Sequence, residues 1–241
     1  LYNHNVTHLL IDSSDIGKYT AFSSIGSDEK YDRYSWIQPF LLDDSQTQET
    51  KNKTNYVYVV GLPLDEDILI QENGNQILLP AQKAGIGAII LPLATNDSKI
   101  EQPHVILVYQ DKQYQVKFRY IFINGQLIDF QSGSEGAIYI FPRLDVVDQR
   151  VSENARGAAM VITPRLFRGM LSQIYLMNDP LKKFPHISLV HTEESLLVDD
   201  LKGQGLNLPS FVYYNGIHGP IKIWEVHYTG KEQIKQEYLD T

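Results

Sequence analysis

Two Asn-Gly dipeptides, each lying between apolar runs, constrain the fold of this chain more than any other feature. Asn73-Gly74 lies between LDEDILIQ and QILLP, and Asn124-Gly125 lies between KFRYIFI and QLIDF. Because both residues of Asn-Gly accept positive φ angles, the dipeptide favours the two-residue turn of a β-hairpin. Residues 116–122 also alternate in the period of a strand with one buried face. Residues 56–148 are therefore expected to hold an antiparallel β module, a small barrel or a sandwich.

The first forty residues predict a strand followed by a helix. Residues 9–11 are apolar, and a cluster of small polar residues follows them. Ser13 or Ser14 is suited to cap the helix, Asp15 to lie in its first turn, and Gly26 to end it. Residues 41–55 are polar and free of aromatic side chains, which indicates a surface linker.

The segment after the β module is expected to return to helix over residues 149–178. Thr163 is a natural N-cap with Pro164 at the first helical position, and an apolar stripe follows at helical spacing. Two strand-like runs, HISLVH and GPIKIWEVHY, come later. The predicted fold class is α+β, with a mixed core (1–45 and 149–241) interrupted by an inserted β module (46–148).

Composition excludes several classes of function. The chain has 241 residues and a net charge of −8, which argues against nucleic acid as the main partner. It has no cysteine, and no apolar run of membrane-spanning length or signal-peptide pattern is present. The 15 tyrosines and 9 phenylalanines favour strands. Since the first residue is Leu1, we expect an excised piece of a longer protein.

The residues with the clearest chemical pattern are Asp15 and Lys18. Their spacing of three puts an acid and a base side by side on one face of the predicted helix. The pair is either a capping acid beside an exposed lysine or a polar contact point for a ligand. The acidic groups at 43–44, 65–67, 193–194 and 199–200 lack the spacing of a calcium loop and are interpreted as solvated loops. We predict no metal site and no self-contained catalytic set in this chain.

Two regions of the sequence resemble the C-terminal globular domain of the archaeal oligosaccharyltransferase catalytic subunit. The first is HLLIDSSDIGKYTAFSSIGSDEKYDRYSW, in which Asp15 and Lys18 match the family's Asp-x-x-Lys helix. Phe22 stands where the family has methionine or isoleucine. The second is RLFRGMLSQIYLMNDPLKKFPHISLVH followed by PIKIWEV, which is similar to the family's late helix and closing strands. The two regions cover about half of the chain.

The resemblance also shows what this chain lacks. The family's Trp-Trp-Asp-Tyr-Gly signature, its membrane helices and its metal-binding loop carboxylates have no counterpart here. The chain therefore resembles a downstream fragment without catalytic residues. In the full-length enzyme, the resemblance implies a divalent cation (Mn or Mg) and a lipid-linked oligosaccharide held by the membrane part.

The family transfers a glycan from a dolichol carrier to asparagine in Asn-X-Ser/Thr, on the extracytoplasmic face of a membrane. The resemblance implies that Asp15, Lys18 and Phe22 contact the Ser/Thr side chain of the acceptor peptide. An alternative is a non-enzymatic β-rich module that binds carbohydrate or protein, with exposed tyrosines and Trp36 stacking on sugars. A second alternative is a soluble hydrolase with a dispersed site, although no nucleophile motif supports it.

Overall fold

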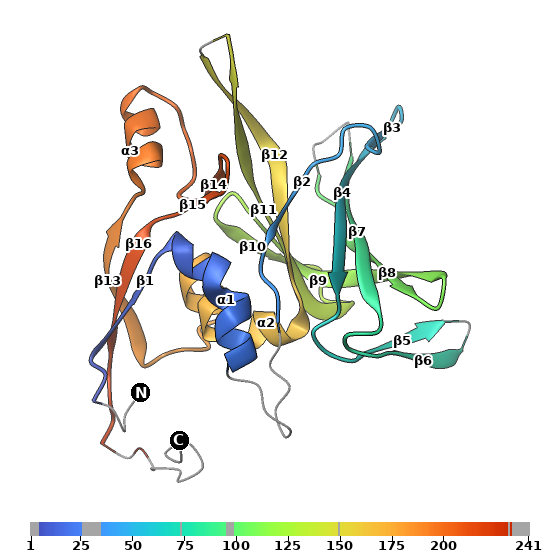
Figure 1. The fold of residues 1–241 in the computed structure, drawn as a ribbon, viewed down its shortest axis with the longest axis horizontal. Coiled ribbons are helices and arrows are strands. Elements are labelled where there is room, and N and C mark those ends of the chain that lie inside the picture. Colours follow the sequence, from blue (N-terminus) through green and yellow to red (C-terminus); the bar gives the residue numbers. More distant parts are fainter. Residues whose placement is uncertain are drawn as a thin grey trace.

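The computed structural model of the chain describes residues 5–25, 35–72, 74–94, 99–148, 150–230 and 232. The fold is of the α+β kind and is mostly sheet, with 51% strand and 16% helix. A three-stranded sheet and the helices lie on one side of the molecule, and a larger sheet extends across the other (Figure 1). The predicted α+β class is therefore confirmed.

The smaller sheet joins the beginning and the end of the described chain. Its central strand β16 (Ile221–Val226) pairs antiparallel with β1 (His8–Ile11) on one edge and with β13 (Ile187–Glu193) on the other. The predicted strands at 9–11, HISLVH and GPIKIWEVHY are thus confirmed. The helical elements are α1 (Ser13–Ile25), α2 (Pro164–Arg168), the π-helix η2 (Leu171–Leu176) and α3 (Leu196–Gly203).

The larger sheet has eleven strands in the described part of the chain. Its main path runs β15-β14-β11-β9-β8-β7-β4-β3, and β10, β12 and β2 pair alongside it. The strands are β2 (Pro39–Leu41), β3 (Gln48–Glu49), β4 (Lys53–Pro63), β7 (Gly85–Ala94), β8 (His104–Tyr109), β9 (Lys112–Ile123), β10 (Gln126–Asp129), β11 (Ser134–Val147), β12 (Arg150–Ile162), β14 (Val212–Tyr213) and β15 (Ile217–His218). A separate hairpin pairs β5 (Ile68–Glu72) with β6 (Asn75–Leu79).

Both expected hairpins are present. Asn124 and Gly125 have φ angles of 52° and 75° and connect β9 to β10. Gly74 has a φ angle of 81° between β5 and β6, and residue 73 lies outside the described residues. The barrel or sandwich expected for this region is not confirmed, because no sheet closes into a barrel among the residues described.

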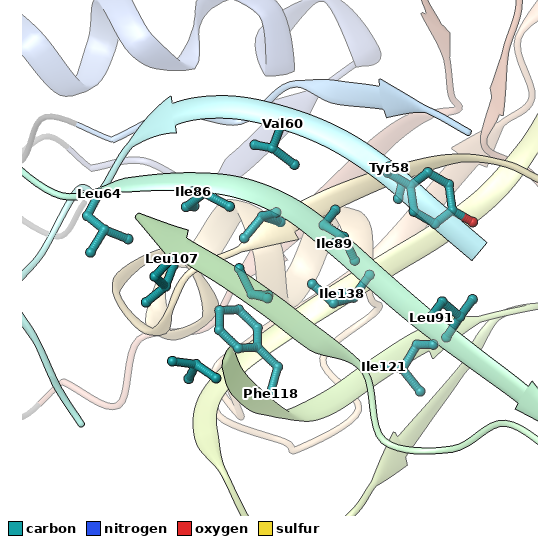
Figure 2. Packing of buried hydrophobic residues seen from close by; sticks show 14 of the residues in the cluster. Tyr58, Val60, Leu64, Ile86, Ile89, Leu91, Leu107, Phe118, Ile121 and Ile138 are labelled. Carbon is teal, nitrogen blue, oxygen red and sulfur yellow. The ribbon is translucent and has the colours of Figure 1, made fainter. Parts of the chain in front are cut away.

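Strand β9 connects the two main hydrophobic clusters. Val116 and Phe118 are buried on one face as the alternation predicts, and the neighbouring polar residues are more exposed. Toward its end the strand is buried on both faces: Ile121 belongs to one cluster, and Tyr120 and Phe122 belong to the other. Figure 2 shows Phe118 and Ile121 converging with residues of β4, β7, β8 and β11 in the first cluster. The β module and the helical part are therefore packed through shared strands.

The expectation of helix from residue 149 is wrong for the first part of that segment. The structure has β12 there, paired with β11 in a long antiparallel hairpin that crosses the predicted boundary at 148. Small residues fit this strand to its neighbour, since a Cβ at Gly157 would lie 2.4 Å from the Cβ of Arg143. Helix begins at Pro164 with Thr163 at the N-cap position, as predicted, but the Thr163 side chain makes no capping hydrogen bond and donates to Asp65 instead. The apolar stripe of this region packs in the second cluster, also as predicted.

Two segments have more regular structure than the sequence indicated. The predicted linker at 41–55 includes β3 and the start of β4. Helix α3 lies in the acidic stretch after β13, where Ser195 caps it by accepting a hydrogen bond from the Val198 backbone N–H at 3.4 Å. Val198 and Leu201 face a third, smaller cluster.

Candidate functional site

Helix α1, which carries the predicted site, begins with a reciprocal cap made by two aspartates. The Asp12 Oδ1 accepts a hydrogen bond from the backbone N–H of Ser14 at 2.6 Å, and the Asp15 Oδ2 accepts one from the backbone N–H of Asp12 at 3.2 Å. This arrangement satisfies amides at the start of the helix. The prediction of Ser13 or Ser14 as cap is wrong, because Asp12 has that role. Gly26 lies outside the described residues.

Asp15 and Lys18 form the predicted pair. The Lys18 Nζ lies 3.3 Å from the Asp15 Oδ1 and donates a second hydrogen bond to the Ser14 Oγ at 2.9 Å. The Lys18 side chain is 54% exposed and the Asp15 side chain is 27% exposed. The ion pair is therefore well solvated and contributes little to stability. Hydrogen bonding to the Ser14 side chain is the main cause that lowers the pKa of Asp12, and Lys18 lowers it further. The start of α1 is therefore a charged polar surface.

Phe22 lies on the same side of α1 as this pair. At 100° per residue, positions 15, 18 and 22 fall within one third of the helix circumference. The Phe22 side chain is 54% exposed, and it is the only exposed aromatic side chain among the residues described. Single exposed apolar side chains are common on protein surfaces, and Leu10, Ile25 and Leu196 are exposed here too. The exposure of Phe22 makes its ring accessible to a ligand and does not by itself assign it a role.

The opposite side of α1 fixes the helix to the core. Ile16 is buried in the second cluster together with Ile37 and Trp224. The buried Ser23 accepts a hydrogen bond from the Ser35 backbone N–H at 2.7 Å. Because these contacts hold α1 from one side, the face that carries Asp15, Lys18 and Phe22 stays more accessible to solvent.

A pocket of about 340 Å³ lies along the other flank of α1. It is bounded by Ser13, Gly17 and Thr20 of the helix and by Ile37 and Ile217 across from it. Ser14, which accepts the hydrogen bond from the Lys18 Nζ, also lines this pocket, whereas Asp15, Lys18 and Phe22 do not. The predicted contact residues are therefore presented on an exposed face rather than inside this pocket.

The acidic run at 65–67 departs from the sequence interpretation. The Asp65 side chain is fully buried and accepts a hydrogen bond from the Thr163 Oγ1 at 2.8 Å. Burial raises the pKa of Asp65, and this hydrogen bond acts in the opposite direction. Glu66 accepts from the backbone N–H of Arg165 and, at 3.0 Å, from the Arg168 guanidinium. The run is thus a structural link between the loop after β4 and α2, and the expectation of a solvated loop is wrong here.

Lys222 is a charged residue that the sequence analysis did not single out. It lies in β16 and is only 4% exposed, although lysine is almost never fully buried unless it is paired. The run PIKIWEV gives no signal for this, because its isoleucines alternate with the lysine and suggest that the lysine faces solvent.

Comparison with protein-family models, with curated proteins and with solved structures found no match for this chain. None of the helices in the described part combines the length and apolar character that a membrane span requires. Among the same residues, no three potential metal-binding side chains come together.

Proposed function

We propose that this chain is the acceptor-side globular domain of a membrane oligosaccharyltransferase, in which α1 contacts the Ser/Thr side chain of an Asn-X-Ser/Thr peptide. The resemblance of its first and last regions to the archaeal catalytic subunit supports this proposal. In the same scheme, residues 46–148 are the β insertion module that some members of that family carry.

The observation that carries the proposal is the composition of the exposed face of α1. Lys18 supplies N–H groups near a peptide hydroxyl, and Asp15 holds the ammonium from the adjacent turn at 3.3 Å. Phe22 supplies an apolar surface one turn further on, where the threonine methyl group would pack. A site that hydrogen-bonds a hydroxyl rejects analogues that lack it, because its polar groups are then left unpaired.

The glycan transfer itself belongs to the part of the enzyme that the resemblance places upstream. There a divalent cation, Mn or Mg, would polarise the leaving group of the lipid-linked oligosaccharide. The role proposed for this chain is binding and orientation of the acceptor, on the extracytoplasmic face. By this scheme the chain alone transfers no glycan.

The test is peptide kinetics in the full-length, membrane-bound enzyme. Lys18→Ala is expected to lower kcat/KM for an Asn-X-Thr peptide by about tenfold or more, since it removes a charged hydrogen-bond donor. Phe22→Ala should lower use of threonine peptides more than that of serine peptides. Ser24→Ala is the matched control, because Ser24 is exposed on the opposite side of the same helix. Unchanged kinetics in Lys18→Ala, with folding intact, would refute the assignment.

The rival function of a carbohydrate-binding module is less well supported. That reading needs tyrosine or tryptophan rings open to solvent for sugar stacking. In the described part of the chain every tyrosine and tryptophan side chain is buried or half-buried, and Tyr58, Tyr139 and Tyr175 are core residues. Glycan affinity of the isolated chain would nevertheless favour this rival over the transferase domain.

A further inference from the structure

Lys222 is a buried cation at the centre of the smaller sheet. In β16, Lys222 and Trp224 point inward, and Ile221 points toward solvent. The side chain of Lys222 therefore enters the second hydrophobic cluster, beneath the π-helix η2 and next to Phe211. A charge in such a place is costly unless hydrogen bonds and an opposite charge compensate for it.

All the groups that contact the Lys222 ammonium are uncharged. Its Nζ donates to the Tyr175 carbonyl oxygen at 2.8 Å and to the Asn178 Oδ1 at 2.6 Å. It also lies 5.4 Å and 5.6 Å from the ring centres of Tyr175 and Phe211. Lys222 forms no salt bridge with any residue that the structure describes. An ammonium has three N–H donors, and these contacts use two of them.

The carboxylate whose charge acts on Lys222 is that of Glu194, and one of its two oxygens is engaged elsewhere. The other, Oε2, is buried and has no hydrogen-bond partner among the described residues. The Glu194 Oε1 accepts from the Lys202 Nζ at 2.7 Å and from the Ser210 Oγ at 2.9 Å. Burial, opposed by the charge of Glu194, lowers the pKa of Lys222 to about 8. A base with this pKa is still mostly protonated at neutral pH. The ammonium is therefore present, and no carboxylate of the described residues forms a salt bridge with it.

A cavity of about 150 Å³ lies against this ammonium. Its lining includes the buried Lys222 and the exposed residues Asn178, Leu189 and Thr192. The rest of the lining includes the aromatic residues Phe122, Tyr139 and Phe211 together with Leu176 and Pro209. A cavity of this volume is large enough for a ligand about the size of a benzene ring. The cavity thus combines an apolar wall, a single positive charge and an opening to solvent.

We propose that this cavity binds a small monocarboxylate, with its carboxylate group against the Lys222 ammonium and its apolar body between the aromatic walls. The third N–H donor of Lys222 is available to such a ligand, and the ligand supplies a negative charge. One positive charge with Glu194 nearby favours a monoanion over a dianion. The proposal concerns a site separate from α1 and does not depend on the function proposed for that helix.

The experiment is titration calorimetry of the purified chain with benzoate, and with benzamide as a neutral ligand of the same shape. Ionic strength is held constant. Saturable one-to-one binding of benzoate, with binding of benzamide about tenfold weaker or more, is the expected result. Equal binding of the two compounds, or no binding of benzoate, would overturn the proposal.

Three variants locate the site. Lys222→Met keeps most of the side-chain volume and removes the charge, so benzoate binding should be lost. Leu189→Trp narrows the cavity and leaves the hydrogen bonds of Lys222 in place; it should also abolish binding, and it keeps the test valid if Lys222→Met fails to fold. Lys112→Met is the control, since Lys112 is an exposed lysine in the β8–β9 hairpin of the other sheet. Benzoate binding unchanged in Leu189→Trp would place the ligand elsewhere and refute the site.

Discussion

Replacement of Lys222 by methionine should change how the stability of the protein depends on pH. Burial lowers the pKa of Lys222 from its ordinary value of 10.5 to about 8. A base whose pKa is lower in the folded state than in the unfolded state destabilises the fold at low pH, where it is protonated in both states. This penalty disappears as the pH rises through the pKa of the unfolded state. A shift of this size corresponds to about 3 kcal/mol. By linkage, about 2 kcal/mol of it should be relieved between roughly pH 7 and pH 9.5.

The assay is urea unfolding of wild type and Lys222→Met at both pH values. The free energy of unfolding of wild type should rise relative to the variant by about 2 kcal/mol at the higher pH, with similar m-values. The comparison with the variant removes contributions common to both proteins, including Tyr139 and Tyr175, whose pKa values burial raises. Parallel pH profiles for the two proteins would show that the lysine is not buried as described.

Three further substitutions test the packing of the core and the surface of α1. Gly136→Ala should destabilise the fold by about 1–3 kcal/mol in the same urea assay, because the new Cβ would lie 2.4 Å from a ring carbon of Phe118. Gly17→Ala should instead stabilise the fold by about 0.5–1 kcal/mol, because a Cβ there meets no atom within 4 Å and alanine favours helix over glycine. Lys18→Ala should change the free energy of unfolding by less than about 1 kcal/mol, because its ion pair with Asp15 is solvent-exposed. A larger drop in the free energy of unfolding for Lys18→Ala would mean that this lysine has a structural role. Equal changes in the free energy of unfolding for Gly136→Ala and Gly17→Ala would contradict the close approach of Phe118 to Gly136.

Local signals in the sequence were sufficient where backbone conformation decides the structure. The positive φ angles of Asn124 and Gly125 are a local requirement of the turn, and the β9–β10 hairpin follows from them. Thr163 and Pro164 likewise mark the start of α2. The α1 helix was predicted, but its cap was assigned to the serines rather than to Asp12, because each of these residue types is a good N-cap.

Long-range pairing and burial were not predictable in the same way. The segment of β12 is rich in residues that favour helix, and pairing with β11 overrides that preference. In β16, period-two alternation gives two faces but does not tell which one faces the core. The structure buries Lys222 and Trp224 and turns Ile221 outward, the reverse of the order that hydrophobicity alone suggests. For this reason the sequence does not predict the cavity at Lys222.

In the candidate site on α1, too, local spacing predicts one part and long-range packing decides the other. Spacing alone placed Asp15 and Lys18 together, and the structure has them as an ion pair. The exposure of Phe22 depends on how Ile16 and Ser23 dock the helix, which the sequence does not reveal. Contact of these residues with an acceptor peptide stays a prediction that peptide kinetics can decide.

The most direct test of the proposed function is the size and membrane partitioning of the native polypeptide that contains this sequence. An antibody raised against the purified chain would detect it in fractionated cells of the source organism. The transferase proposal predicts a species much larger than 27.5 kDa that remains with the membrane fraction. A species near 27.5 kDa in the soluble fraction would contradict it, and the binding-module function would then become the leading one.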